Sequence, residues 1–270
     1  MTRREVLIGL MGFAGGAATA GAVAGLDFGP EETGVVQGQR PREMSRQTWR
    51  VQTTEDWTKI NAASPDRVQM VHVPGRNDPV MRATVKQGDF HEKTNGARAE
   101  GALTSLRIKE GDESILRWSV QFPESFVPPE KWGVFTQFHH RLGDPGYPED
   151  RWFSPPVELV VHGEQMKLRT MAGMYEKTGR KEDVVLWEEP LQRGRWLDFE
   201  LPIKWSQDER EGRVSLNFKG KSVLKNVPTA NMYEDGEVFL AQGWYRDTGK
   251  GNPDQTLYHA GTELEVVRYT

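Results

Sequence analysis

The sequence contains no cysteine, so disulfide bonds, cysteine nucleophiles and thiolate metal ligands are all excluded. A lipid anchor on an N-terminal cysteine is excluded for the same reason. The histidines also lack the spacing that is typical of a zinc site. The fold must therefore be stabilised by core packing, with or without a bound cation. Nine tryptophans and eleven phenylalanines supply the large apolar side chains that such a core needs.

Positive charge is not in excess either. The chain has 35 lysine and arginine residues against 39 aspartate and glutamate residues, which gives a formal net charge of −4. A nucleic-acid-binding protein would be expected to carry a basic stripe over much of one face, so we expect no nucleic-acid partner. An anionic ligand is not excluded, because its binding depends on the local field of the site rather than on the net charge.

Long hydrophobic runs are absent except near the N-terminus, where a weakly apolar run at residues 6–23 is rich in alanine and glycine. Arg3 and Arg4 come directly before this run, and residues 22–24 (Ala-Val-Ala) offer a small-residue cleavage site. This order resembles a twin-arginine export signal. A membrane anchor is the alternative interpretation, but so many glycines make a poor spanning helix.

We therefore predict a signal peptide at residues 1–24, a flexible spacer at residues 25–48 and a single globular domain at residues 49–270. The spacer is inferred from its glycine, proline, glutamate, glutamine and arginine content and from its lack of apolar periodicity. The mature protein is expected to be secreted, free of the membrane after signal removal, and a monomer.

The domain shows a strand pattern rather than a helix pattern. Leu116, Trp118 and Val120 alternate with polar residues, and residues 197–205 repeat the same period of two. Strands are predicted at 68–73, 80–85, 102–108, 114–122, 133–140, 157–162, 166–171, 184–188, 197–205, 213–218, 238–245 and 263–269. About a dozen short strands without amphipathic helices between them indicate an all-β fold of two stacked antiparallel sheets.

Three short segments carry residues that can bind an anion and transfer protons. Arg98 and Glu100 would share one face of a strand, and so would Gln137 and His139, because each pair is two residues apart. Tyr245 follows Ala241 and Gly243 on alternate positions, where the two small residues would leave space for a sugar ring. An amide, an imidazole, a guanidinium and a phenol in one groove could cleave a uronate polymer by elimination.

In their order and spacing, these segments resemble the R-x-E, Q-I-H and Y-F-K-A-G-x-Y motifs of the jelly-roll polysaccharide lyases. The layout is similar to the heparin-lyase-I-like and glucuronan-lyase-like group, and alginate lyases share the motif order. The resemblance covers roughly residues 80–268. It implies a β-jelly-roll, a concanavalin-like sandwich, and a lyase that cleaves an anionic, uronic-acid-containing polysaccharide by β-elimination.

The resemblance also implies roles for single residues. Gln137, with Arg98, would bind and neutralise the uronate carboxylate. His139 would share that task or act as the base for one C5 epimer. Tyr245 would donate a proton to the leaving oxygen and could also abstract the C5 proton, so the assignment of base and acid stays open.

Two departures from the lyase motifs bear on the substrate. Ala241 stands where the motif has lysine, and Arg246 follows Tyr245 where alginate lyases often carry a smaller polar residue. Both disfavour alginate and favour a glucuronan-type or glycosaminoglycan-like chain. Arg246 adds a cation that could hold a neighbouring carboxylate or sulfate. Glu100, His162 and Arg117 are the other predicted substrate-binding residues.

No cofactor is expected to be required, but a structural calcium ion is an option, because relatives in this group often hold one. The loop 247–254 is rich in oxygen donors, although turns use aspartate, asparagine and glycine in any case. The sequence therefore does not place a calcium site.

Two other functions stay open. A glycoside hydrolase on a similar sandwich would use a carboxylate pair, for which Asp198 and Glu200 are candidates, but the E-x-D-x-x-E string of β-glucanases is absent from the chain. A non-catalytic carbohydrate-binding module or lectin would lose the Gln137, His139 and Tyr245 set. Ultraviolet absorbance separates the lyase from the other two functions, because only elimination gives an unsaturated, absorbing product.

Overall fold

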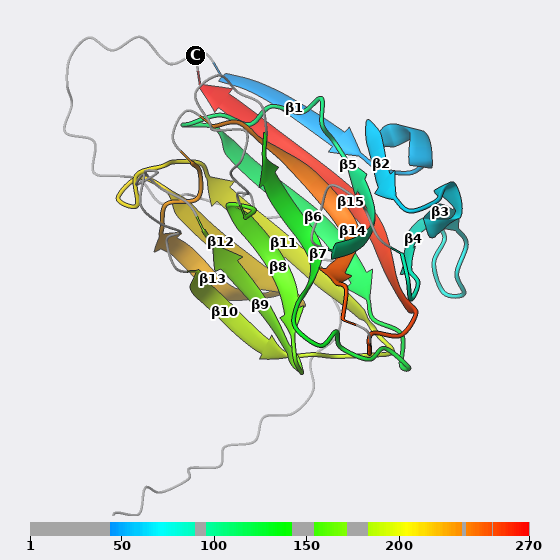
Figure 1. Cartoon of the computed structure of the whole chain (residues 1–270). Helices are drawn as coiled ribbons and strands as arrows, with labels where there is room; N and C mark the ends of the chain where they lie inside the picture. The colour runs from blue at the N-terminus through cyan, green and yellow to red at the C-terminus, as the bar shows by residue number, and fades with distance from the viewer. Residues whose placement is uncertain are drawn as a thin grey trace, which may run out of the picture. The chain divides into compact units, whose positions relative to one another are not determined.

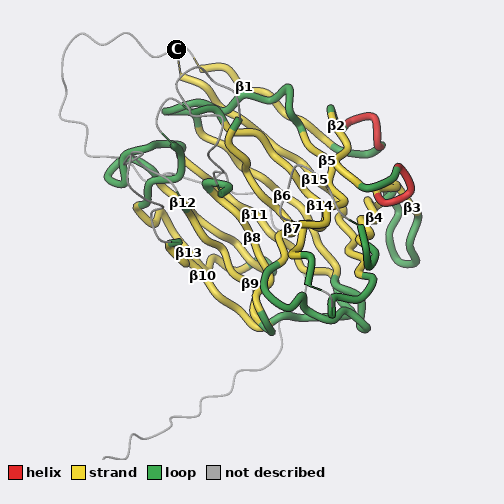
Figure 2. The backbone as a smooth tube through the Cα atoms, viewed as in Figure 1, coloured by secondary structure: helices red, strands yellow, loops and turns green. Residues whose placement is uncertain are grey.

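The computed structural model describes residues 44–89, 96–141, 154–171, 183–233, 236–249 and 251–269. These residues form two antiparallel sheets, A and B (Figure 1). Two 3-10 helices, η1 (Thr54–Asp56) and η2 (Pro65–Arg67), lie near the start of the described chain, as Figure 2 shows. In these ranges no helix has the length and apolar character needed to span a membrane.

Sheet A has eight strands in the order β13-β12-β11-β6-β15-β4-β3, and β1 pairs with β15 beside this path. Its strands are β1 (Met44–Arg50), β3 (Val68–Val71), β4 (Val80–Val85), β6 (Glu113–Gln121), β11 (Trp196–Lys204), β12 (Arg213–Phe218), β13 (Lys221–Pro228) and β15 (Gln255–Tyr269).

Sheet B has seven strands in the order β10-β9-β8-β7-β14-β5-β2. Its strands are β2 (Lys59–Ala62), β5 (Gly96–Ala102), β7 (Gly133–His140), β8 (Val157–His162), β9 (Gln165–Thr170), β10 (Val184–Pro190) and β14 (Val238–Asp247). The strand β14 therefore lies between β7 and β5, with which it pairs along most of its length.

The core lies between the inner faces of the two sheets. Phe135 of β7 packs against Phe199 of β11, and Phe138 of β7 packs edge-to-face on Trp205, which directly follows β11. Phe135 and Phe138 both face sheet A because the register of β7 against β8 shifts between Val134 and Thr136. The side chains that flank Phe138, those of Gln137 and His139, therefore point away from sheet A. Burial of such aromatic residues is the main favourable contribution to a fold that has no disulfide.

The predicted strands at 80–85, 133–140, 157–162 and 213–218 coincide with observed strands, whereas other parts of the pattern differ. Strand β1 begins at Met44, inside the predicted spacer, and pairs with β15. Strand β5 covers Gly96–Ala102 rather than 102–108. It consists largely of alanine and glycine, which have low strand propensity. These small residues suit a buried strand that others approach closely, as at Gly101, where a Cβ would lie 2.4 Å from the Trp57 ring.

Candidate active site

The three predicted segments lie on three neighbouring strands of sheet B. Strand β5 carries Arg98 and Glu100, β7 carries Gln137 and His139, and β14 between them carries Tyr245. In the register of the sheet, Tyr245 pairs with Arg98, Ala241 with Gln137, and Phe239 with His139. Residues that are more than a hundred positions apart in sequence are thus brought together.

Direct contacts link four of these side chains in one row. The Gln137 amide donates from Nε2 to Glu100 Oε1 at 2.5 Å. The other carboxylate oxygen of Glu100 lies 3.6 Å from Arg98 Nε. The Arg98 guanidinium carbon lies 4.0 Å from the centroid of the Tyr245 ring, a cation–π contact. The predicted residues therefore share one face, while their chemical roles stay a prediction.

His139 lies two residues from Gln137, on the same side of β7. Its Nδ1 is 2.6 Å from the His140 carbonyl oxygen. A carbonyl can only accept, so Nδ1 carries the proton and Nε2 keeps a free lone pair. Burial lowers the pKa of His139 to about 4, and the charge of Arg98 acts in the same direction. His139 is therefore a neutral imidazole at neutral pH, which is the form that can accept a proton.

Buried polar atoms without hydrogen-bond partners gather at this site. Glu100 and Gln137 are each only 1% exposed. Within the described ranges, Arg98 Nε, Glu100 Oε2 and Gln137 Oε1 have no hydrogen-bond partner. Burial raises the pKa of Glu100, and Arg98 and Gln137 partly offset this rise. Unsatisfied buried polar groups are unfavourable for folding, so a cluster of them indicates a site shaped for a polar ligand.

The direction of Tyr245 depends on a bulge in β14. Two residues, Gly243 and Trp244, separate Gln242 from Tyr245, whereas one residue separates the paired positions on β7. Trp244 is part of the core, and Tyr245 meets Arg98 on the opposite face. Gly243 has a φ of 146°, and a Cβ there would lie 2.1 Å from the Ala99 carbonyl oxygen. A glycine is needed for this close approach of two backbones, rather than to leave room for a sugar ring.

Two residues that support Tyr245 were not predicted from the sequence. Trp132 packs edge-to-face on the Tyr245 ring, with centroids 4.8 Å apart. At Gly96 a Cβ would lie 2.5 Å from Tyr245 Cε2, so only glycine leaves the ring in place. The backbone amide of Trp132 donates to the Asp247 carboxylate at 3.3 Å, which ties the start of β7 to the end of β14. Trp132 directly precedes a predicted strand, but nothing local indicates what it contacts.

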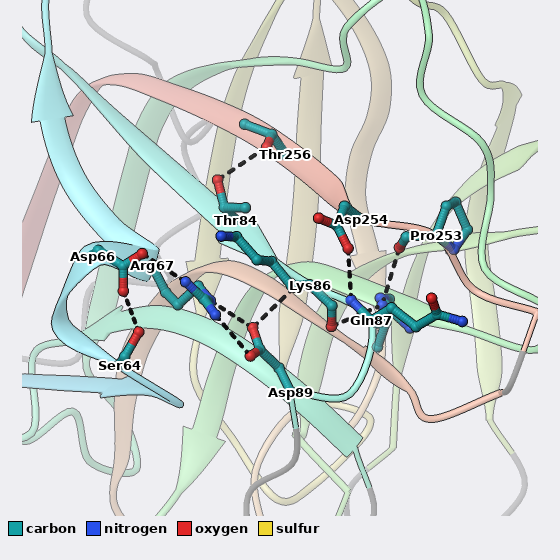
Figure 3. Close-up of polar contacts among 11 residues, drawn as sticks. Ser64, Asp66, Arg67, Thr84, Lys86, Gln87, Asp89, Pro253, Asp254 and Thr256 are labelled. Atoms are coloured by element: carbon teal, nitrogen blue, oxygen red, sulfur yellow. Dashed lines mark hydrogen bonds and ion pairs between the residues drawn. The ribbon is translucent and has the colours of Figure 1, made fainter.

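Arg246 does not lie on this face, contrary to its predicted role. It is 2% exposed, and its guanidinium donates to the carbonyl oxygens of Asp247 and Pro253, both at 3.1 Å, and of Lys86 at 3.5 Å. Figure 3 shows Lys86 and Pro253 in the surrounding network, where Gln87 also donates to Asp254. Adjacent strand residues point to opposite faces, so Arg246 faces away from Tyr245. Its bonds to Lys86, which follows β4, and to Pro253, which precedes β15, connect β14 to one end of sheet A. Arg246 is not available to bind a polymer.

Arg117 is also placed away from the site, because β6 belongs to sheet A. Its guanidinium pairs with Glu200 at 2.6 Å and with Glu263 at 3.5 Å on the outer face of that sheet. Asp198, the other half of the predicted hydrolase pair, accepts a hydrogen bond from Ser119. Which sheet a strand joins cannot be inferred from its alternation alone, and this is why Arg117 was assigned wrongly.

Two predicted substrate-binding residues remain on sheet B in different settings. Glu100 is enclosed between Arg98 and Gln137, so it holds those side chains rather than facing solvent. His162 ends β8 and is exposed. Four residues earlier on β8, Glu158 pairs in register with Gln137 and forms a 2.6 Å ion pair with Arg169. Polar side chains therefore follow one another across the strands, from Gln137 on β7 through Glu158 on β8 to Arg169 on β9.

The loop predicted as a calcium option is closed by hydrogen bonds. Asp247 accepts from the backbone amides of Lys131 and Gly249 and from the Asn252 side chain. Its carboxylate oxygens are therefore engaged with N–H donors. In the part of the chain that the structure describes, no three histidine, aspartate or glutamate side chains are grouped as metal ligands. A calcium ion stays a prediction without an assigned site.

The two stacked antiparallel sheets form an all-β sandwich like that of the jelly-roll lyases. The endo-β-1,4-glucuronan lyase from the fungus Trichoderma reesei superposes with a TM-score of 0.62, at 16% identity, over 77% of this chain and 90% of that chain. The marine alginate lyase from Aplysia kurodai gives a TM-score of 0.53, at 10% identity, over 82% of this chain and 97% of that one. At such identities, these likenesses show the fold alone.

The sequence itself matches the model of the polysaccharide lyase family over residues 49–262. The chain belongs to this family. No curated protein matches it at a significant level.

Proposed function

We propose that this protein is an exported lyase that cleaves a uronic-acid-containing polysaccharide by β-elimination and leaves unsaturated uronate ends. Family membership supports the reaction class. The two structural relatives are a glucuronan lyase and an alginate lyase, and both of these substrates are uronate polymers. The twin-arginine-like sequence at residues 1–24 supports export. The observation that carries the proposal is the cluster of unsatisfied polar atoms beside Tyr245 and the neutral His139.

The first task of the site is to neutralise the uronate carboxylate, because the C5 proton is otherwise too weakly acidic. The Arg98 guanidinium supplies positive charge, and its buried Nε, which lies 3.6 Å from Glu100 Oε2, has no hydrogen-bond partner among the described residues. Gln137 uses one Nε2 hydrogen on Glu100 and keeps the second for the carboxylate. Donors that are held in place before the substrate arrives lower the reorganisation that the reaction requires.

The second task is proton transfer around the C4–C5 bond. The base removes the C5 proton, the C–H electrons form the C4=C5 double bond, and the bond from C4 to O4 breaks. Tyr245 gives its hydroxyl proton to O4, and the adjacent Arg98 stabilises the negative charge that develops on the phenol oxygen. The base is His139 through Nε2, or Tyr245 itself where the proton and the leaving group lie on one side of the ring.

The direct test is to incubate the full-length protein with glucuronan, glycosaminoglycans and alginate and to follow ultraviolet absorbance. Elimination raises the absorbance, whereas a hydrolase releases reducing ends without absorbance and a lectin does neither. The positions of Asp198 and Glu200 argue against the hydrolase, since both carboxylates are bonded on the outer face of sheet A. With Arg246 removed from the site, only Ala241 still favours glucuronan-like polymers over alginate.

His139 predicts the acidic limit of activity. With a pKa of about 4, its Nε2 lone pair is free above that pH and protonated below it. We therefore expect the part of the kcat/KM profile that belongs to His139 to stay level down to about pH 5 and to fall as the pH drops through about 4; kcat/KM reports the free enzyme. The measurement is the initial rate of absorbance increase at low substrate concentration across pH 3 to 8 (~0.5-unit steps).

A matched pair of variants separates His139 from other titrating groups. His162→Gln changes an exposed histidine on β8 and should keep the acid limb of wild type. His139→Gln should lose most of the rate, and its residual activity should lack the limb that belongs to His139. Any fall caused by protonation of the polymer's own carboxylates should be the same in wild type and in both variants. If the limb that His139→Gln removes lies near the ordinary histidine pKa of 6.5, the assignment is wrong.

A further inference from the structure

Behind the candidate site, a histidine of the opposite sheet reaches the bulge that directs Tyr245. His259 lies on β15 of sheet A, and its Nε2 is 3.0 Å from the Gly243 carbonyl oxygen on β14 of sheet B. The carbonyl accepts, so Nε2 carries the proton and Nδ1 does not. Within the described ranges Nδ1 has no hydrogen-bond partner, although it is buried. Burial lowers the pKa of His259 to about 4, which keeps the ring neutral.

A second bond between the sheets lies directly beside the first. Thr262 of β15 donates from Oγ1 to Gln242 Oε1 at 2.8 Å, and the Gln242 amide donates to Thr136 of β7 at 3.3 Å. Gln242 and Gly243 are the residues at which the register of β14 shifts. Two polar side chains of sheet A therefore bind the two successive residues that begin the bulge.

A bulge in β15 makes this arrangement possible. The register of β15 against β6 shifts between Ala260 and Glu263, and Gly261 has a φ of 62°. In a regular strand, residues three apart point to opposite faces. The extra residue lets His259 and Thr262 both reach sheet B. The bulges of β14 and β15 are thus joined across the core.

The histidine at position 259 has opposing effects on stability. Its Nε2–H satisfies the buried Gly243 carbonyl, which an apolar side chain would leave without this donor, whereas its Nδ1 is buried without a hydrogen-bond partner among the described residues. What the histidine adds is a fixed donor to the Gly243 carbonyl, two residues before Tyr245. A bulge changes the direction of the side chains that follow it. Because His259 binds the β14 bulge on the side that faces the core, it keeps the Tyr245 ring beside Arg98.

We propose that His259 is a positioning residue of the lyase site, which holds the Gly243 carbonyl, with Thr262 on the neighbouring Gln242, so that Tyr245 stays in its reactive place. This inference rests on the proposed function, in which Tyr245 transfers a proton. His259 itself does not touch the substrate, because it lies between the sheets.

The test compares His259→Leu, His259→Gln and Thr262→Val in the full-length protein, with kcat and KM from the absorbance assay and thermal midpoints alongside. His259→Leu should lower kcat by roughly 10- to 100-fold while KM changes little, because a small misplacement of the reacting group costs rate rather than binding. His259→Gln should recover most of kcat, since its amide can still donate to the carbonyl. Thr262→Val should lower kcat to an intermediate level.

Thr170→Val is the matched control for lost stability. The Thr170 hydroxyl at the end of β9 forms a buried 3.0 Å hydrogen bond with Thr229, which directly follows β13 of sheet A, so this bond also connects sheet B to the other side of the core but does not involve β14. Its removal should lower the thermal midpoint and leave kcat near wild type. If Thr170→Val loses as much kcat as His259→Leu, or if folded His259→Leu and Thr262→Val both keep kcat within about twofold, the positioning role is wrong.

Tyr245→Phe, measured in the same series, separates this inference from the proposed function. If Tyr245→Phe is inactive and His259→Leu has normal kcat, only the positioning role fails. If Tyr245→Phe is fully active, the proton-transfer role of Tyr245 fails, and the positioning role fails with it. Should His259→Leu not fold, Thr262→Val still decides the question against Thr170→Val.

Discussion

Replacing Tyr245 with phenylalanine should lower kcat by about three orders of magnitude while leaving the fold intact, in the range expected for loss of a general acid or base. The ring keeps its contacts with Trp132, with the Arg98 guanidinium and with the space above Gly96. Only the hydroxyl that would protonate the leaving oxygen is removed. The measurement is kcat from the ultraviolet signal, with polymer binding followed separately by calorimetry.

Tyr258→Phe is the control for this variant. Tyr258 lies on β15 of sheet A, where it pairs with Gln121 and Arg82, so loss of its hydroxyl should leave kcat unchanged. Binding of the polymer by Tyr245→Phe should stay within a few-fold of wild type, since the carboxylate-binding groups Arg98 and Gln137 are retained. A Tyr245→Phe enzyme with more than about a tenth of wild-type kcat would show that another group supplies the proton.

The second large effect is expected for Gln137→Ala. The amide is held by Glu100 at 2.5 Å and is proposed to donate its second hydrogen to the uronate carboxylate. Its loss should lower kcat/KM by about 10²- to 10³-fold, as for other fixed donors to a developing negative charge. The variant should also be less stable by about 1–3 kcal/mol, because a buried oxygen of Glu100 loses its donor. Absorbance assays and chemical denaturation measure the two effects.

Gln137→Glu tests whether the charge or only the shape of the Gln137 side chain matters, and Gln121→Ala is the matched control for loss of an amide. Gln137→Glu keeps the shape but places a carboxylate beside Glu100 and the substrate, so activity should be lost at neutral pH and should partly return in acid, where the new group is protonated. Gln121→Ala removes a partly buried amide on sheet A and should leave kcat/KM unchanged. Near-normal activity of Gln137→Glu at neutral pH would exclude a role in neutralising the carboxylate.

Much of the strand pattern could be read locally. The alternation of Leu116, Trp118 and Val120 reappears as a buried inner face of β6, and Gly133–His140 was predicted with the bounds that the structure has. The pairings Arg98 with Glu100 and Gln137 with His139 followed from the same period of two. Alternation also places Arg246 opposite Tyr245, so its assignment to the site was avoidable from the sequence.

Other features depend on residues far apart in the chain. Strand β5 was displaced in the prediction because alanine and glycine give it no strand signal, and its role is clear only between β14 and β2. The sheet to which Arg117 belongs depends on the partners of β6. The contacts of Trp132 and His259 with β14 cross between strands or sheets, and no local pattern indicates either one.

The all-β class, the faces of most strands and the residue types available for elimination chemistry follow from the amino-acid sequence, because a period of two is a local property of the backbone. The pairing of the strands, by contrast, makes β5, β14 and β7 neighbours and places the bulge at Gly243 that turns Tyr245 toward Arg98. Strand order and bulges arise from contacts between distant segments. The free energy of those contacts comes from the whole core, so no single stretch of the sequence indicates it.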